Sequence, residues 1–383
     1  MPSSAETGLS AEAGALAVVL RSNDQLVDLS RFSEVGFDAA VDAMADATRS
    51  ALVSDIKCFV SWCRSRREPV RVVPADPEDI VHYLRWLQAG SKARRPSKPA
   101  TLDRRVASIA RLHRMLGFGD REALPTRAGM VRDTLKAART RRGQRQRQAA
   151  PLRLGVAMGE GDEAPEGVTI QALIGGCGTD LVSLRDAALL SLGYGGGLRV
   201  SELTAAKVDH FTWLGNGSGR FEIVRSKTDQ AGKGVLVWVS PSTAARIKAW
   251  LKASDIAEGH VFRRVNVLRD EVEGFPRTRC FVGKKPLSRQ GVVGILRRRI
   301  LDIVDRGLVE LGDTDRDEML RAVSSHSLRV GLTQDLFAAG EDGAGIALAL
   351  RWSSPTTALR YARELAVSSN AAARVLGSLS DGL

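Results

Sequence analysis

Residues 139–167 are the part of the sequence that most restricts how this chain can fold. Five arginines alternate there with threonine, glutamine and glycine as far as Arg147, and a segment rich in glycine, glutamate and proline continues to Gly167. A stretch with so few apolar side chains cannot form a hydrophobic core. The whole chain has 383 residues, which is long for one ordinary domain. We therefore predict two folded units joined by a basic linker over residues 141–167.

The first 35 residues are rich in alanine, serine and acidic side chains. Their apolar pattern is limited to the short run from Leu16 to Leu20. We expect residues 1–35 to form an unstructured tail.

Residues 36–140 carry the pattern of a helical domain. Leu52, Ile56 and Cys63 lie on one face of a helix predicted for residues 47–66. Asp76 followed by Pro77 predicts the start of a second helix, which runs to about Gln88. A third helix is expected over residues 98–117, and a fourth ends near Arg139.

Residues 168–383 predict a larger domain of α+β type. A capped helix begins near Thr169, and an apolar helix follows through Leu189 and Leu192. Residues 220–225 and 234–239 alternate like two strands joined by a loop, and helices are expected to dominate from Ser242 onward. The fold class is therefore mainly α, with a small antiparallel sheet in the second domain.

The charge of the chain favours a polyanionic partner. Lysine and arginine number 56 against 44 acidic residues, which gives a net charge of +12 and a pI near 10. Many basic proteins never bind nucleic acid, so charge alone does not decide the partner. Four cysteines without a CxxC pair indicate free thiols in a reducing compartment. With no signal-peptide pattern or apolar span, we expect a cytoplasmic protein without a membrane partner.

Four short motifs in the second domain have residue types suited to phosphodiester chemistry. They are Arg199-Val200-Ser201-Glu202-Leu203, Ser226-Lys227-Thr228, His326-Ser327-Leu328-Arg329, and Trp352 with Tyr361 nine positions later. Two fixed guanidiniums, from Arg199 and Arg329, can bind the non-bridging oxygens on which charge builds up. The Tyr361 phenol becomes a nucleophile when nearby cations and a base assist its deprotonation.

The remaining side chains of these motifs have complementary roles. Lys227, on the loop between the predicted strands, can protonate a departing alkoxide. His326 lies one helical turn before Arg329 and can transfer a proton or hold the phosphate. Trp352 can donate its indole N–H to a phosphate oxygen. Each residue alone also fits a structural role, such as a surface ion pair, a loop charge or a core aromatic ring, so their combined order carries the argument.

That order resembles the tyrosine recombinases, also called phage integrases. The matching segments are LRVSEL, RSKT, HSLRVG, RWSS and ALRYAR. The segment HSLRVGLTQDLFAAG, tryptophan rather than histidine at position 352, and FVSWCRSR in the first unit are most similar to the Cre-like phage and plasmid enzymes. The resemblance extends from about residue 40 to the C-terminus.

The resemblance implies a helical, SAM-like core-binding domain and a catalytic domain that form a C-shaped clamp on double-stranded DNA. The helices at 47–66 and 98–117 would contact the major groove, and a helix from Ser288 would read bases from the catalytic side. Glu202 would be the acidic helper of the catalytic residues. The candidate DNA contacts are Arg49, Ser54, Lys57, Thr101, Arg104, Arg105, Arg139, Arg141, Ser288, Arg289 and Gln290. The basic run at 139–147 is equally well explained as a solvated linker.

The resemblance also implies a reaction and an assembly. Tyr361 would form a 3′-phosphotyrosyl link, and exchange of strand pairs would pass through a Holliday junction without a metal or nucleotide cofactor. A C-terminal helix within residues 364–383 would join four protomers on two inverted-repeat sites; the alternative is a helix folded back on its own domain. The bacterial host would carry the gene on a phage or plasmid, and the need for an accessory protein is left open.

Three other functions share parts of this pattern. A type IB topoisomerase uses similar chemistry without a defined site, a telomere resolvase carries additional domains, and a non-catalytic DNA-binding protein would lack some catalytic groups. Four features depart from the family pattern: the long N-terminal tail, the insertion at 155–167, the glycine-rich run at 193–197, and Arg351, where a smaller residue is expected.

Overall fold

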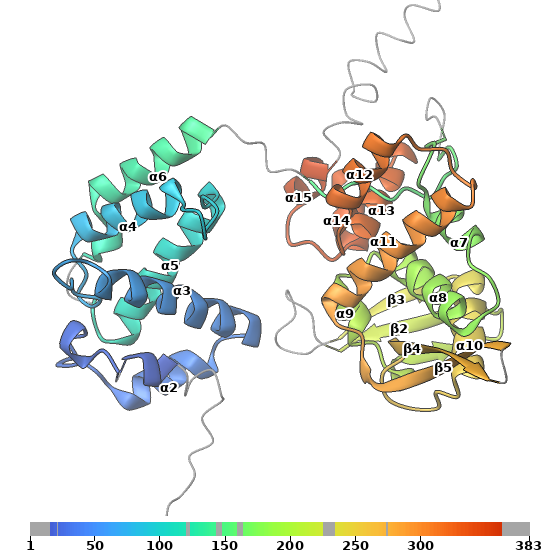
Figure 1. The fold of residues 1–383 in the computed structure, drawn as a ribbon, viewed down its shortest axis with the longest axis horizontal. Coiled ribbons are helices and arrows are strands. Elements are labelled where there is room, and N and C mark those ends of the chain that lie inside the picture. The colour runs from blue at the N-terminus through green and yellow to red at the C-terminus, as the bar shows by residue number, and fades with distance from the viewer. Residues whose placement is uncertain are drawn as a thin grey trace, which may run out of the picture. The chain divides into compact units, whose positions relative to one another are not determined.

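The computed structural model describes residues 16–20, 22–119, 123–142, 148–158, 164–224, 234–272 and 275–361. The chain divides into two compact units, Met1–Gln146 and Arg147–Leu383 (Figure 1). Helices predominate in both units, and the antiparallel sheets belong to the second. This architecture confirms the predicted mainly helical fold with a small sheet. None of the helices in these ranges is long and apolar enough to cross a membrane.

Unit 1 is helical, and capping explains where one of its helices begins. The Asp76 side chain accepts the Glu78 N–H at 2.7 Å, and Pro77 occupies the first turn, where its missing N–H costs nothing. The elements are η1 (Asp24–Leu26), α2 (Glu34–Asp42), α3 (Asp46–Arg64), α4 (Pro77–Ala89), α5 (Pro99–Met115), η2 (Pro125–Arg127) and α6 (Gly129–Arg142). The helices predicted over 47–66, 77–88 and 98–117 are confirmed as α3, α4 and α5.

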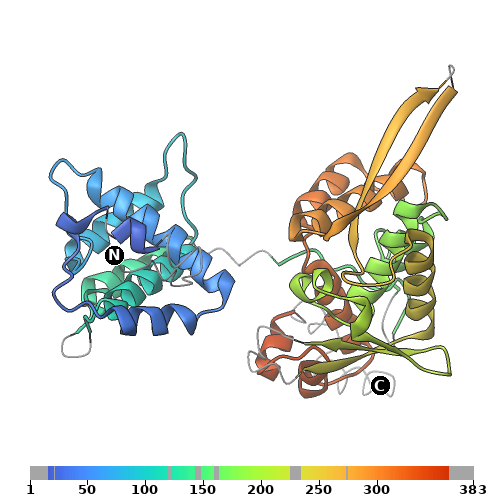
Figure 2. The same cartoon turned by 90° about the horizontal axis from the view of Figure 1, so that it is seen from below.

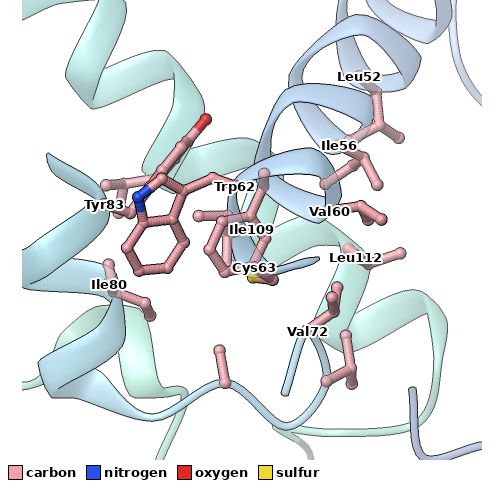
Figure 3. Packing of buried hydrophobic residues seen from close by; sticks show 14 of the residues in the cluster. Leu52, Ile56, Val60, Trp62, Cys63, Val72, Ile80, Tyr83, Ile109 and Leu112 are labelled. Carbon is pink, nitrogen blue, oxygen red and sulfur yellow. The ribbon is translucent and has the colours of Figure 1, made fainter. Parts of the chain in front are cut away.

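The core of unit 1 forms where α3, α4 and α5 face one another (Figure 3). Tyr83 of α4 packs against Phe59 and Trp62 of α3, with ring centroids 5.0 and 5.4 Å apart. His113 is fully buried, and its Nε2 accepts the Ala75 N–H at 3.0 Å. This histidine is therefore a satisfied core residue that fixes the start of α4 against α5.

The prediction of an unstructured tail is wrong for residues 16–20 and 22–35. Residues 16–20 are helical, and Leu16, Leu20 and Val27 are buried in the core of unit 1. Positions four apart lie on the same helix face, so a five-residue run is enough to bury two leucines. The run was too short to establish a periodic pattern, because its stability comes from packing against the rest of the unit. Residues 1–15 lie outside the described ranges.

Unit 2 combines a three-stranded sheet, a two-stranded ribbon, nine α-helices and a 3-10 helix among its described residues. The α-helices are α7 (Ile170–Gly175), α8 (Leu181–Gly195), α9 (Val200–Thr204), α10 (Pro241–Ser254), α11 (Arg289–Asp305), α12 (Asp313–Ala322), α13 (Ser327–Ala338), α14 (Gly343–Ala349) and α15 (Pro355–Tyr361), with the 3-10 helix η3 (Val208–His210). The strands are β1 (Phe211–Trp213), β2 (Gly219–Ile223), β3 (Val235–Val239), β4 (Arg263–Val272) and β5 (Phe275–Pro286).

The predicted strand pair is confirmed as β2 and β3, with β1 added at the other edge of β2. Phe221 stands opposite Phe211 on one side and Val237 on the other, and it is almost fully buried. Residues 225–233, which connect β2 to β3 and include Lys227, lie outside the described ranges.

Helices predominate after Ser242, as expected, but residues 263–286 form two strands that the sequence pattern did not predict. Strands β4 and β5 pair antiparallel and extend away from the rest of unit 2 as a long ribbon, drawn in gold in Figure 2. Neighbouring side chains Val267 and Leu268 point to opposite faces, yet they are 42% and 51% exposed. Because neither face is buried, the sequence lacks the apolar alternation by which strands are recognised.

A segment of the predicted linker instead packs along α13. The Leu152 N–H donates to the Ser327 carbonyl at 3.1 Å, and Leu152 is fully buried. A β-carbon at Gly331 would lie 1.9 Å from the Leu152 carbonyl oxygen, so only glycine permits this close approach. The prediction of a flexible linker over 141–167 is therefore wrong for these residues.

The carboxylate of Asp335 fixes this segment to the helices of unit 2. Asp335 is fully buried and accepts hydrogen bonds from Arg153 Nε at 2.5 Å, the Leu154 N–H at 2.7 Å and the Tyr194 hydroxyl at 2.5 Å. Burying a charge is costly unless every such partner is present. Asp335 therefore joins three separate parts of the chain.

We predict that Asp335→Ala lowers the free energy of opening α13 by about 3–5 kcal/mol, because it leaves the Arg153 charge without its buried partner. Native-state hydrogen exchange of the α13 amides measures this quantity. The matched control is Asp305→Ala at the exposed end of α11, with an expected change below about 0.5 kcal/mol. Equal protection of the α13 amides from hydrogen exchange in the two variants would contradict the role given to Asp335.

Candidate active site

Tyr361 lies beside His326 at the end of α15. The Tyr361 hydroxyl is 2.9 Å from His326 Nε2, and its ring stacks on Trp352 with centroids 5.3 Å apart. His326 precedes α13 as its N-cap, and Gln334 of the same helix donates to the Tyr361 carbonyl at 3.4 Å. The phenol and the imidazole thus meet within one chain, although 35 residues separate them.

Arg329 forms the buried centre of the site. The Arg329 side chain donates through Nη1 to the Gly197 carbonyl at 2.6 Å and through Nη2 to the Leu350 carbonyl. Its guanidinium lies 5.0 Å from the ring centroid of Trp352, a cation–π contact, and the residue is 1% exposed. The Arg329 Nε has no hydrogen-bond partner among the described residues.

Arg199 and Glu202 approach Arg329 from the start of α9. The Arg199 guanidinium donates to Glu202 Oε1 at 2.7 Å, and the Arg199 backbone N–H donates to Glu202 Oε2 at 2.9 Å. Glu202 is buried, whereas the Arg199 side chain is 18% exposed. Arg199 is therefore the more accessible of the two arginines to a ligand.

The glycine-rich run before Arg199 is explained by close packing. Gly197 has a φ of +51°, and a β-carbon there would lie 2.3 Å from Leu350 Cδ2. A β-carbon at Gly193 would similarly lie 2.7 Å from Leu328 Cδ1. These glycines allow the turn between α8 and α9 to reach Arg329 and the α14–α15 segment.

The site holds an excess of positive charge. Burial, followed by the charges of Arg199 and Arg351, lowers the pKa of Arg329 to about 9. Burial, followed by Arg329 and Arg199, lowers the pKa of His326 below its ordinary value. The site therefore favours an anionic ligand, and His326 is predominantly neutral at pH 7.

Six of the seven predicted catalytic residues come together in this cluster. They are Arg199, Glu202, His326, Arg329, Trp352 and Tyr361. Lys227 lies outside the described ranges, as do residues 364–383 with the predicted C-terminal helix. Their roles stay predictions.

Sequence reasoning missed the contribution of Arg351. Its side chain contacts Glu202 and the glycine turn, and its carbonyl oxygen is 3.4 Å from Arg199 Nη2. The only available signal was that an arginine at this position is unusual for the family.

In unit 1, the predicted DNA contacts divide into exposed and internally paired residues. Ser54 and Lys57 are exposed on α3, and Thr101 of α5 is half-buried. Arg49 pairs with Asp46 at 2.5 Å.

The buried carboxylate of Asp55 forms ion pairs with two of the predicted DNA contacts, Arg104 and Arg105. Arg104 donates to Asp55 Oδ2 at 2.5 Å and remains exposed. Arg105 is largely enclosed and donates to the Tyr83 hydroxyl at 2.8 Å, so it braces the α4–α5 packing in this structure.

Arg139 and Arg141 are exposed near the end of α6, and Arg139 pairs with Asp103 at 2.6 Å.

In unit 2, the predicted helix start is confirmed at α11. The Ser288 hydroxyl accepts the Gly291 N–H at 3.0 Å, and Arg289 and Gln290 are exposed in the first turn. A capped helix start with exposed basic and amide side chains suits contact with DNA. The contact itself stays a prediction.

Known proteins are similar to this chain in both sequence and fold. The family model described as "Phage integrase family" matches residues 167–366, more than half of the chain. An integrase/recombinase xerD homolog of Selenomonas ruminantium is 32% identical over 235 residues, which cover 59% of this chain and 62% of that protein, less than two thirds of its length. The recombinase cre of Escherichia phage P1 is 23% identical over 337 residues, covering 87% and 89%.

A solved structure adds support for the fold. XerH site-specific recombinase, bound to a palindromic difH substrate in a post-cleavage complex, matches 93% of this chain and 94% of its own with a TM-score of 0.50 and 12% identity. At that identity the likeness concerns the fold, while the family model establishes the relationship. This chain therefore belongs to the phage integrase family of tyrosine recombinases.

Proposed function

We propose that this protein is a site-specific DNA recombinase that cuts and rejoins DNA through a covalent bond between Tyr361 and a backbone phosphate. The observation that carries the proposal is the 2.9 Å contact between the Tyr361 hydroxyl and His326 Nε2, next to the buried Arg329 and the partly exposed Arg199. A nucleophile within hydrogen-bond distance of a base is the arrangement that covalent catalysis needs. Membership of the phage integrase family supports the same reaction.

His326 would act as the base toward Tyr361. A neutral imidazole whose Nδ1 carries the proton can accept the phenol proton at Nε2. Burial and two guanidiniums disfavour the charged imidazolium, which keeps this acceptor available at pH 7. The cations also favour the phenolate that forms when the proton leaves.

Arg199 and Arg329 would stabilise the phosphate as it becomes pentacoordinate. The Tyr361 oxygen forms a bond to phosphorus, the bond from phosphorus to the 5′-oxygen breaks, and Lys227 gives that oxygen a proton. The bond energy is kept in the 3′-phosphotyrosyl link, so a free 5′-hydroxyl from a partner strand reverses the step. Neither a metal nor a nucleotide is needed in this sequence of steps.

The DNA partner would be a duplex with inverted-repeat sites. The net charge of +12 favours this polyanion. Exposed side chains on α3, α5 and the start of α11 would contact the duplex. Four protomers, joined through residues 364–383, would hold two sites and exchange strands through a Holliday junction. The related XerH was solved with a palindromic substrate, which supports an inverted-repeat target.

We predict that wild-type protein forms a covalent DNA adduct and that Tyr361→Phe forms none while still binding the same DNA. The ring of phenylalanine keeps the Trp352 stacking and removes only the nucleophilic oxygen. Fragmented genomic DNA of the source organism is incubated with each protein, and covalent complexes are recovered after denaturation and sequenced at the cleaved end. An adduct with Tyr361→Phe would refute the assignment. Relaxation of plasmids without any preferred cleavage sequence would favour a topoisomerase.

We predict an acid limb in the rate of adduct formation, in which the rate falls as the pH decreases, with a midpoint below the ordinary histidine pKa of about 6.5. Protonation of His326 removes the acceptor, and the lowered pKa places this loss below the ordinary histidine value. His326→Gln should be slower and lack the limb. His260→Gln is the matched control, because burial also lowers the pKa of that histidine while it lies outside the cluster. A limb that persists in His326→Gln would contradict this base.

A further inference from the structure

Arg351 has a backbone conformation that is unfavourable for its residue type. Its φ is +56°, in the left-handed region that glycine adopts freely and a residue with a β-carbon adopts at a cost. Asp255 is the other non-glycine residue with positive φ in the described ranges. Strain of this kind persists where surrounding contacts enforce it.

Both Nη atoms of Arg351 are hydrogen-bonded to the protein around them, whereas its buried Nε has no hydrogen-bond partner among the described residues. Its Nη2 atom donates to Gly197 O at 3.1 Å and to Glu202 Oε2 at 3.3 Å, and both Nη atoms are 3.2 Å from Gly196 O. The side chain is 8% exposed. These contacts are those of a brace and leave little of the guanidinium open to a ligand.

Arg351 shares the Glu202 carboxylate with Arg199. Glu202 Oε1 accepts from the Arg199 guanidinium, whereas Oε2 accepts from both the Arg199 backbone and Arg351. The Arg351 carbonyl oxygen in turn accepts from Arg199 Nη2 at 3.4 Å. The three residues thus form a closed ring of contacts, in which Glu202 cannot rotate without losing one of its arginines.

Arg351 is also linked to the nucleophile through its chain neighbour Trp352. Trp352 follows Arg351 directly, stacks on Tyr361 and lies under the Arg329 guanidinium. The ring formed by Arg199, Glu202 and Arg351 therefore connects the backbone beside the nucleophile to the arginine that is most accessible to a phosphate. A carboxylate divided between two guanidiniums also offsets the charge of Arg199 less than a dedicated partner would.

We propose that Arg351 is a positioning residue for phosphoryl transfer, which holds Glu202 in place and through it orients Arg199 toward the scissile phosphate. The inference rests on the proposed function, because it assigns a role within that reaction. Arg351 acts through Glu202 and makes no contact of its own with the phosphate. Its strained backbone is retained because glycine, although relaxed at this φ, would leave the ring open.

The test uses a nicked duplex that carries the cleavage site recovered from the wild-type adducts, and measures single-turnover adduct formation. We expect Arg351→Gly to slow this step by about tenfold to a hundredfold, the scale of a misplaced catalytic group. DNA affinity should stay within about twofold, and thermal stability should not fall, because the substitution relieves backbone strain. Arg351→Lys should restore only part of the rate, since an ammonium lacks the planar fork that reaches all three acceptors.

Asp255→Gly is the matched control. It relieves a similar left-handed conformation, φ +53°, at the exposed end of α10 and outside the cluster. We expect this variant to react at the wild-type rate. A rate loss equal to that of Arg351→Gly would show that backbone relaxation alone is responsible and would overturn the inference.

A double-mutant cycle with Glu202→Gln tests the route of action. If Arg351 acts through Glu202, Arg351→Gly should slow the Glu202→Gln protein by less than about twofold. If the two substitutions slow adduct formation by factors that multiply in the double variant, this route is overturned. A large loss of DNA affinity in Arg351→Gly would indicate direct phosphate contact instead.

The two proposals fail in distinguishable ways. A wild-type protein that never forms an adduct overturns the proposed function and this inference with it. A reactive wild-type protein with an equally reactive Arg351→Gly variant overturns the role of Arg351 alone.

Discussion

The burial of Arg329 is the constraint on which the arrangement of the site depends. Removing a guanidinium from water costs several kcal/mol unless fixed acceptors replace the lost hydration. Those acceptors are the carbonyl oxygens of Gly197 and Leu350, which belong to turns far apart in the sequence. By bonding to both, Arg329 holds the α8–α9 turn, α13 and the α14–α15 segment together, and so brings Arg199 and Tyr361 to one place.

The same burial leaves a charge imbalance that a phosphate would correct. Among the described residues of the site, Arg199, Arg329 and Arg351 face one carboxylate, that of Glu202. Burial, followed by the charges of Arg199 and Arg351, lowers the pKa of Arg329 to about 9. A cluster of this kind lowers the stability of the free protein and is relieved by a bound anion. Charge that increases on the phosphate during transfer would be stabilised further. The strained backbone of Arg351 fits the same compromise between stability and function.

Much of the fold could be predicted because its local signals agree with one another. The cap at Asp76, the apolar faces of α3 and α5, and the alternation in β2 and β3 each specify their element within a few residues. The ribbon β4–β5 could not be predicted, because both of its faces are exposed and no period marks it. The burial of Leu16 and Leu152 could not be predicted either, because it depends on packing against distant parts of the chain.

The candidate site likewise has a part that the sequence predicts and a part that it does not. The order and residue types of the motifs were sufficient to predict the cluster around Tyr361. The geometry of Arg351 was not predictable, because it requires a left-handed φ and a closed ring of contacts with Arg199 and Glu202. The inward orientation of Arg105 likewise depends on Asp55 and Tyr83, which come from other helices.

The central claim is that the Tyr361 oxygen becomes bonded to DNA phosphorus, and mass spectrometry of the trapped complex tests it most directly. After nuclease treatment and digestion with a glutamate-specific protease, residues 342–364 form one peptide. The account predicts that this peptide gains the mass of a nucleotide joined through its 3′-phosphate, and that fragmentation locates the addition on Tyr361. An addition on a serine or threonine of the same peptide, or on a peptide from elsewhere in the chain, would contradict it.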